Sequence, residues 1–187
     1  MDFLQIVQWI LFAIVTIFLI AISYKSLQNI KTHGFYRFFA FEFTAILVII
    51  NLPYWFYDPF CLIQILSWII LFISLLMEYF SFYYLTKLGG TTERNSGSAN
   101  FNFENTANLV DTGIYKYIRH PMYSSLFYLA LGTMLKYLSL PSICLTAFAI
   151  LFLVFTAKTE ETENIAFFGN AYKDYINRTK MFIPFIF

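Results

Sequence analysis

Five apolar stretches, each close to the length of a membrane-spanning helix, dominate this sequence. They cover approximately residues 3–23, 36–56, 60–85, 122–138 and 141–157. An α-helix needs about 20 mostly apolar residues to cross roughly 30 Å of hydrocarbon, and a membrane β-strand needs only about half as many. Because the stretches have the helical length, we predict an all-α, integral membrane helical bundle with about five transmembrane helices.

The composition supports a membrane protein and narrows its partners. The chain is 59% hydrophobic and 12% charged, whereas about a quarter of the residues of soluble domains are charged. Its net charge is only +1 and its basic residues form no stripe, so we expect no nucleic acid partner. Membrane lipids and a lipid-like small molecule are the expected partners. The two cysteines lack the Cys-x-x-Cys spacing of zinc sites, and we predict no metal site.

We expect a single membrane domain over residues 1–187, in four parts. Residues 1–86 hold three spans, 87–121 a cytoplasmic loop, 122–157 a helical hairpin and 158–187 a cytoplasmic tail. The C-terminal hairpin follows from the short link at Ser139, Leu140 and Pro141, which allows only an antiparallel turn. Residues 87–112 are rich in Gly, Ser, Asn and Thr, which is typical of a lid or binding loop.

The tail and the basic residues predict how the chain sits in the membrane. Phe168, Tyr172 and Tyr175 form one helical stripe, so we predict an interfacial cytoplasmic helix on the membrane surface. Lys and Arg lie mainly in the first loop, the third loop and the tail, namely Lys25, Lys31, Arg37, Lys87, Arg94, Lys116, Arg119, Lys158, Lys173, Arg178 and Lys180. The positive-inside rule then places the N-terminus outside and the C-terminus in the cytoplasm. The host is a bacterial inner membrane or the endoplasmic reticulum.

Most of the polar chemistry gathers in the segment from Gly113 to Tyr123, just before the fourth apolar stretch. Pro121 suits the first position of a helix, and the backbone N–H groups that follow it are unpaired donors. Arg and Tyr are also common as interfacial anchors at the ends of membrane helices. His120 could likewise do no more than hydrogen-bond a nearby carbonyl, so these residues alone leave both interpretations open.

Two acidic residues, Glu160 and Glu161, directly follow the fifth apolar stretch. Because the last two stretches form a hairpin, these acids are expected near Arg119 and His120. The contact could be an exposed salt bridge worth only ~0–1 kcal/mol, or it could be one wall of a site.

These residues carry a resemblance to a known family. The segment 109–123 contains Arg-His-Pro-x-Tyr, and Glu-Glu, Phe-Gly-x-x-Tyr and Pro184 follow it in order. Together they resemble the isoprenylcysteine carboxyl methyltransferase and phospholipid methyltransferase superfamily over about the last 100 residues. Any one of these elements is weak, whereas the combination is specific.

The resemblance implies an integral membrane enzyme that binds S-adenosylmethionine at the cytoplasmic end of its final hairpin. Carried over, it implies that His120, Pro121 and Tyr123 line the cofactor pocket and that Glu160 and Glu161 close it. Tyr115 and Arg119, in the same segment, are further candidates for this site. The chemistry agrees, because carboxylates accept hydrogen bonds from the ribose hydroxyls and the ammonium, and aromatic faces stabilise the cationic sulfonium.

Three further residues are candidates for catalysis: Glu42, Glu78 and Arg178. Acids inside membrane spans are costly and usually functional, and an amine acceptor must lose a proton to such a group, whereas a carboxylate or thiolate needs no base. Each acid could instead hydrogen-bond a Tyr or Ser on a facing helix. Arg178 could pair with an anionic substrate or reach a lipid phosphate.

We therefore predict an S-adenosylmethionine-dependent methyltransferase that acts on a lipid-like substrate at the cytoplasmic membrane face. The acceptor is of the prenylcysteine carboxylate or phospholipid amine type. One alternative is an NADPH-dependent reductase of the sterol type, although the chain lacks an extra basic cluster for the additional phosphate. Another is a non-catalytic membrane scaffold or lipid-binding protein.

Overall fold

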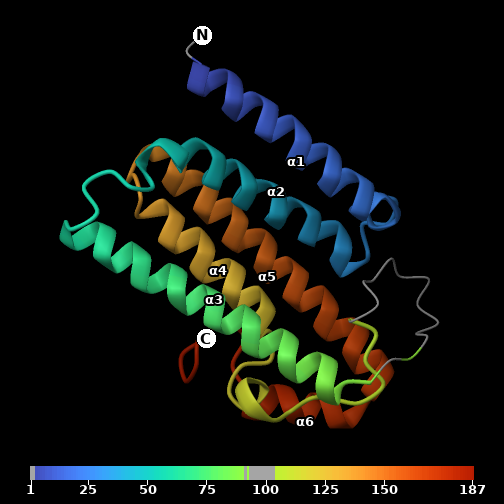
Figure 1. Cartoon of the computed structure of the whole chain (residues 1–187). Helices are drawn as coiled ribbons and strands as arrows, with labels where there is room; N and C mark the ends of the chain where they lie inside the picture. Colours follow the sequence, from blue (N-terminus) through green and yellow to red (C-terminus); the bar gives the residue numbers. More distant parts are fainter. Residues whose placement is uncertain (1–2, 91, 93–103) are drawn as a thin grey trace.

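The computed structural model describes residues 3–90, 92 and 104–187, and this part of the chain contains helices and no strand (Figure 1). The elements are α1 (Phe3–Leu27), α2 (His33–Asn51), the 3-10 turn η1 (Leu52–Tyr54), α3 (Leu62–Leu88), the 3-10 turn η2 (Gly113–Lys116), α4 (Pro121–Met134), α5 (Leu140–Phe168) and α6 (Asn170–Arg178). The predicted helical bundle is confirmed. Residues 91 and 93–103 of the predicted lid, which spans 87–112, lie outside the described residues.

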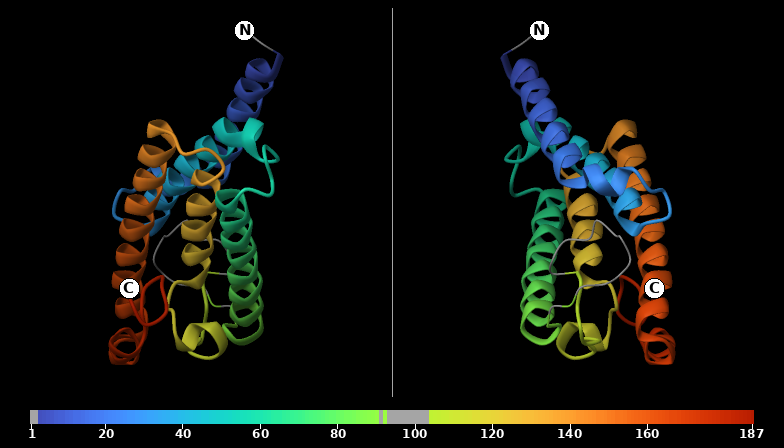
Figure 2. Two further views of the ribbon diagram at one scale, coloured as in Figure 1. Left: turned by 90° about the vertical axis from the view of Figure 1, so that its left-hand side faces the viewer. Right: turned by 90° about the vertical axis from the view of Figure 1, so that its right-hand side faces the viewer.

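Four helical segments of the described chain are long and apolar enough to cross a membrane, and α4 is not one of them. The predicted fourth span ran over 122–138, but α4 has only 14 residues, or about 21 Å at 1.5 Å per residue. It nevertheless returns the chain between α3 and α5, which run in the same direction (Figures 1 and 2). The chain thus passes the bundle five times, with one short pass.

Helix α5 is longer than the predicted fifth span, which ended at residue 157. It continues to Phe168, because no helix breaker interrupts the sequence before Gly169. Gly169 has a φ of 64° and separates α5 from α6, a conformation that favours glycine. Glu160 and Glu161 therefore lie on α5 itself and not on a separate tail helix.

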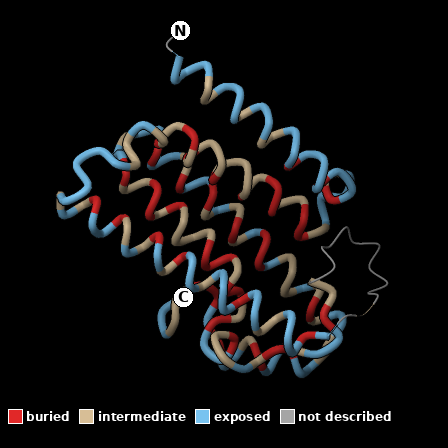
Figure 3. The backbone as a smooth tube through the Cα atoms, viewed as in Figure 1, coloured by how far each residue is buried: buried red, intermediate tan, exposed pale blue. Residues whose placement is uncertain are grey.

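The helices differ in how much of their surface other helices cover. Helix α2 packs on α5, α3 packs on α4, and α1 packs mainly on α2 at the edge of the bundle. Figure 2 shows α1 tilted away from the other helices, and Figure 3 shows most of α1 as exposed. Its exposed side chains include Trp9, Ile14 and Phe18, which suits contact with lipid.

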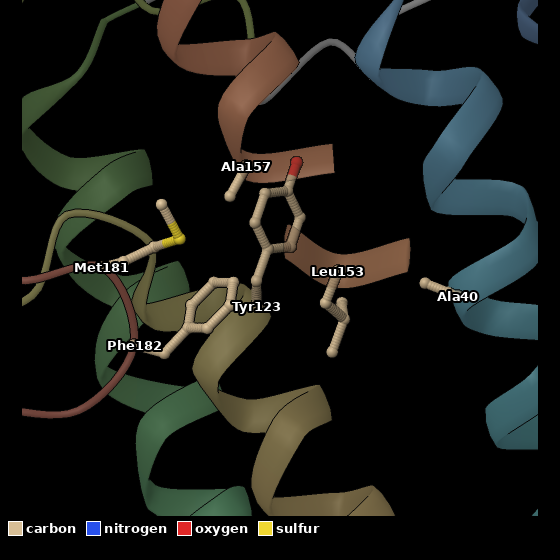
Figure 4. Close-up of a cluster of buried hydrophobic side chains, with 6 residues drawn as sticks. All are labelled: Ala40, Tyr123, Leu153, Ala157, Met181 and Phe182. Carbon is tan, nitrogen blue, oxygen red and sulfur yellow. The ribbon is translucent and has the colours of Figure 1, made fainter. Parts of the chain in front are cut away.

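Small residues let the central helices approach closely. One buried cluster joins Ala40, Tyr123, Leu153, Ala157, Met181 and Phe182 (Figure 4). A second cluster joins Leu47, Ala130 and Ala149. Alanine at such contacts lets helix backbones come close together, as is common in membrane bundles. The first cluster also ties the C-terminal residues to α4 and α5.

The C-terminal segment holds the start of α4 in place. Lys180 N–H donates to Tyr117 O at 3.0 Å, and its carbonyl accepts from Arg119 N–H at 2.9 Å. The Tyr175 hydroxyl donates to Tyr115 O at 2.7 Å. Tyr172 and Tyr175 are buried, so the predicted stripe of α6 packs against the protein, and the position of the helix at the membrane surface stays a prediction. Their burial follows from the turn at Gly169, which points α6 back towards η2.

Candidate functional site

A cavity of about 280 Å³ lies at the end of the bundle where α2 and α4 begin and where α3 and α5 end. Its polar wall carries Arg37, Glu104, Arg119, His120, Glu160, Tyr115, Tyr123, Tyr172 and Tyr175. Its apolar wall includes Phe41, Leu126 and Leu129. The cavity is therefore amphipathic, with ionisable groups at one side and membrane-type side chains at the other.

Six of the seven residues assigned to the cofactor site line this cavity. They are Tyr115, Arg119, His120, Pro121, Tyr123 and Glu160. The seventh, Glu161, contacts two of them from α5. The predicted proximity of the α4 start to the two acids is confirmed, because His120 Nε2 lies 3.3 Å from Glu161 Oε1 and its Nδ1 lies 3.6 Å from Glu160 Oε2. Their role in binding stays a prediction.

His120 is the centre of this cluster. It is the N-cap of α4 and only 4% exposed, and its ring stacks on Tyr123 with centroids 5.5 Å apart. Burial alone would lower the pKa of His120, but its contacts with Glu160 and Glu161 raise that pKa above the usual value. The buried imidazole is therefore held in its charged form by two carboxylates.

Arg119 takes part in the same cluster. Its Nε pairs with Glu161, and its Nη1 donates to Thr179 O at 2.9 Å. Both charged side chains are largely buried, at 11% and 14% exposure. The pair is thus not the exposed surface salt bridge that the sequence also allowed.

A second ionic cluster, which the sequence did not predict, lies beside the first. His33 Nδ1 lies 2.7 Å from Glu163 Oε2, His33 Nε2 lies 3.5 Å from Glu104 Oε2, and Arg37 pairs with Glu104. The prediction that Arg37 belongs to the first loop is wrong, because Arg37 lies inside α2 and is 2% exposed. The sequence contained a sign of this cluster, because His33 and Arg37 are four residues apart near the start of an apolar stretch and so share one helix face.

Glu104 links the chain before η2 to α2 through this cluster. Burial alone would raise the pKa of Glu104, but its contact with His33 and the charge of Arg37 lower it below the usual value. The carboxylate is therefore stabilised in its charged form. Glu104 and Arg37 both line the cavity, so this pair forms part of the wall.

Four buried tyrosines complete the polar wall, and three of them lie outside the membrane-spanning segments. Burial raises the pKa of Tyr115, Tyr172 and Tyr175, so their hydroxyls stay neutral. Tyr faces attract cations, and the attraction grows where water is excluded. The wall thus offers carboxylates, charged donors and aromatic faces within one small space.

The three candidates for catalysis lie in different places. Glu78 lines the cavity and accepts a hydrogen bond from Ser125 Oγ at 2.6 Å. Glu42 is not among the lining residues and accepts from Thr16 Oγ1 of α1 at 2.5 Å. Arg178 is also outside the lining and pairs with Asp111 at 2.6 Å on the exposed surface. The structure brings only Glu78 to the predicted cofactor residues.

Comparison with known proteins gives the family. A sequence model of the isoprenylcysteine carboxyl methyltransferase (ICMT) family matches residues 68–168 of the 187-residue chain. The chain belongs to the isoprenylcysteine carboxyl methyltransferase family. The matched segment contains Glu78, Glu104, the segment 113–123 and both Glu160 and Glu161. It excludes α2 and α6, so Arg37 and two of the tyrosines come from outside the ICMT match.

Relatives in this family carry one name, protein-S-isoprenylcysteine O-methyltransferase. The protein of Saccharomyces cerevisiae is 38% identical over 79 residues, which are 42% of this chain and 33% of the yeast protein. Those of Mus musculus and Schizosaccharomyces pombe are 38% identical over 84 and 80 residues, covering 43% and 42% of this chain and 29% and 34% of the relatives. The match thus spans about a third of each of these ICMT proteins. No solved structure matches the chain.

Proposed function

We propose that this protein is an S-adenosylmethionine-dependent methyltransferase that acts on a lipid-like substrate at the cytoplasmic membrane face. The acceptor is of the prenylcysteine carboxylate or phospholipid amine type. The observation that carries the proposal is the amphipathic cavity, whose polar wall holds His120 between Glu160 and Glu161. The relatives' name as O-methyltransferases supports the same reaction class.

The residues of the polar wall fit the cofactor. A cavity of about 280 Å³ is close to the lower end of small-molecule sites, about 300–1,000 Å³. Glu160 can accept hydrogen bonds from ribose hydroxyls or an ammonium, and Arg119 and His120 can hold a carboxylate. The tyrosine faces suit a cationic sulfur. When bound, S-adenosylmethionine supplies a methyl group that is activated by that positive charge.

The protein's own contribution to such a reaction is alignment and the exclusion of water. Correct positioning of reacting groups can be worth ~7 to 11 kcal/mol. The apolar wall with Phe41, Leu126 and Leu129 suits the hydrocarbon body of an acceptor that arrives from the bilayer. Its polar head would then reach the ionisable wall.

The same wall speaks against a cofactor with an extra phosphate. Each basic side chain of the lining is already paired with a carboxylate. The pairs are Arg37 with Glu104, Arg119 with Glu161, and His120 with Glu160 and Glu161. S-adenosylmethionine also brings a carboxylate, but its ammonium and its sulfonium give it a net positive charge. A further phosphate would bring additional negative charge next to these acids with no cation of its own. The geometry therefore favours the methyltransferase over a reductase.

Titration of S-adenosylhomocysteine into the full chain in detergent tests the cofactor assignment. We expect binding that His120→Ala and Glu161→Gln each weaken about tenfold or more, because hydrogen bonds to charged groups contribute ~1.5–3 kcal/mol. Asp174→Asn is the matched control, since Asp174 is exposed on α6 and the change is again acid to amide. Binding of NADPH with no binding of S-adenosylhomocysteine would contradict the proposal.

A second experiment tests the acceptor class. The protein is incubated with labelled S-adenosylmethionine and total host lipids, and the products are analysed by mass spectrometry. We expect the label in a lipid-like molecule. Label in protein alone, or no label transfer, would exclude a lipid-like acceptor.

A further inference from the structure

After the polar helix α6, the chain turns back towards the apolar part of the bundle. Helix α6 ends at Arg178, and residues 181–187, which we call the return turn, follow it. Figure 4 shows Phe182 of this turn beside Tyr123 of α4, in the buried cluster that both residues share. The Phe182 ring also stacks on that of Phe127, with centroids 6.2 Å apart. The return turn therefore lies beside α4 and not beyond its end.

This packing is at the level of the apolar part of α5. Residues 140–157 of α5 include no charged residue, and Lys158 is the first one after them. Leu153 and Ala157, which share the cluster with Phe182, both belong to this uncharged part. The uncharged part of a spanning helix lies in the hydrocarbon, and its first charged residues mark the interface. The return turn thus reaches the edge of the hydrocarbon, although it is far too short to cross it.

The outer side of the return turn is apolar and exposed. Phe185 is 80% exposed and Ile186 is 75% exposed. Phe185 also has a φ of 67°, a left-handed conformation that is unusual for an aromatic residue and costs free energy. Water would not compensate for the exposure of these side chains, whereas the hydrocarbon of a lipid would.

The backbone of the return turn is largely hydrogen-bonded within the turn. The N–H groups of Phe182 and Ile183 donate to Phe187 O at 2.8 and 2.6 Å, and Ile186 N–H donates to Ile183 O at 3.2 Å. Pro184 has no N–H group. A segment that leaves water must bond its backbone polar groups internally. The return turn meets this requirement for contact with lipid.

The surfaces on both sides of the return turn are of the kinds that face a membrane. Val154 of α5 packs against the same cluster as the turn, and Leu151, three residues earlier and on the same side of the helix, is exposed. On the other side, the ring of Tyr117 lies 5.9 Å from that of Phe185, and Lys116 Nζ lies 5.9 Å from the centroid of the Tyr117 ring. Aromatic and lysine side chains are typical of the headgroup level.

We propose that the return turn inserts shallowly into the lipid bilayer at the cavity end of the bundle, and that this insertion holds the start of α4. Its partner is the hydrocarbon of the acyl chains, which Phe185 and Ile186 enter. Two hydrogen bonds join this region to the site, because Arg119 N–H donates to Lys180 O at 2.9 Å and His120 N–H donates to Met181 O at 3.3 Å. The proposal does not depend on the reaction that the cavity catalyses.

Lipid crosslinking of the unaltered chain tests the insertion. The full chain is placed in nanodiscs of phosphatidylcholine that carries a diazirine near the ester end of one acyl chain, and it is irradiated and digested with trypsin. Cleavage after Lys173, Arg178 and Lys180 releases residues 174–178 of α6 and the return turn as separate peptides. We expect the lipid-linked fraction of the return turn to be at least about fivefold that of the α6 peptide, because only inserted side chains meet the acyl chains. An equal or smaller fraction would mean that water or another protein covers the turn, and would overturn the proposal.

Two variants of one exposed residue test the link to α4. Ile186→Asp should lower the lipid-linked fraction of the return turn at least about threefold, because a charge is costly in hydrocarbon, and the matched control Ile186→Val should not. Hydrogen exchange of the Arg119 and His120 amides should be faster in Ile186→Asp alone.

The outcomes separate the two parts of the proposal. Unchanged exchange at Arg119 and His120 in an Ile186→Asp protein that has lost its lipid links would overturn the effect on α4. Should Ile186→Asp fail to fold, the comparison of the two peptides from the unaltered chain still decides whether the return turn inserts.

Discussion

The two ends of the bundle both bury polar side chains, but they do so with different chemistry. The end with the cavity holds ionisable groups in two clusters, around His33 and around His120. The opposite end holds mainly neutral groups, such as Asn51, whose Nδ2 donates to Thr133 O at 3.3 Å and to Ser142 Oγ at 3.2 Å. Polar burial in a membrane protein therefore does not by itself mark a site.

A buried cation at the opposite end, Lys136, shows the contrast. Lys136 is 3% exposed and donates to Gln64 Oε1 at 3.2 Å, and its Nζ lies 3.5 Å from the centroid of the Trp68 ring. An amide and an aromatic face compensate this charge, whereas carboxylates compensate Arg37 and His120. Amides and rings do not titrate, so that end is suited to stability and the cavity end to binding.

Removal of Arg37 should have the largest effect on stability. Arg37→Ala leaves Glu104 buried with only one of its two cationic partners, His33, and breaking a buried pair in this way costs about 3–5 kcal/mol. The matched control is Arg178→Ala, because Arg178 forms an exposed pair with Asp111 that is worth only ~0–1 kcal/mol. Unfolding in mixed micelles measures both. If Arg37→Ala and Arg178→Ala lost equal free energy of unfolding, the buried ion pair would contribute no more to stability than the exposed one.

A change of pH should have the second-largest effect on the free energy of unfolding, through the ionisable groups at the cavity end. The lowered pKa of Glu104 contributes stability that is present above its usual value of 4.5 and is lost as the pH falls. The raised pKa of His120 contributes stability that is full below its usual value of 6.5 and is lost as the pH rises through the raised pKa. The free energy of unfolding should therefore be greatest between these limits and fall on both sides.

Micelle unfolding across a pH series measures this profile. His120→Gln should flatten part of the decline on the alkaline side, because His33 lies between Glu104 and Glu163 and also contributes to it. The part of the acid-side decline that is due to Glu104 should remain. An alkaline decline that is the same in His120→Gln would show that His120 is not its source.

Replacement of Lys136 should have the smallest effect. Lys136→Met keeps an unbranched side chain but loses a cation–π contact worth about 0.5–2 kcal/mol and the hydrogen bond to Gln64. The lower desolvation cost of methionine offsets part of both losses. We expect a loss of about 1–2 kcal/mol, smaller than that of Arg37→Ala, and unchanged binding of S-adenosylhomocysteine. Unfolding and titration calorimetry on the same sample measure both quantities. A loss as large as that of Arg37→Ala would mean that the two ends do not differ.

The sequence by itself determined the helical membrane architecture and one wall of the site. Long apolar stretches require helices, because only helices or closed barrels satisfy the backbone in a bilayer. The link at residues 139–141 is too short for anything except a hairpin, so the neighbourhood of His120 and Glu161 follows from the order of the residues. Periodicity also predicted a stripe with Tyr172 and Tyr175, although not the direction in which it faces.

Only the tertiary structure decided which residues far apart in the chain complete the cavity. Arg37 meets Glu104, and Glu78 faces the site while Glu42 faces α1. Hydropathy does not predict these outcomes, because a membrane helix that is apolar on all sides has no preferred face in its sequence. The rotation of α2 and α3 depends on packing against their neighbours, through contacts such as Ser74 with α4. That packing, and not the pattern of residues, selects Glu78 for the cavity.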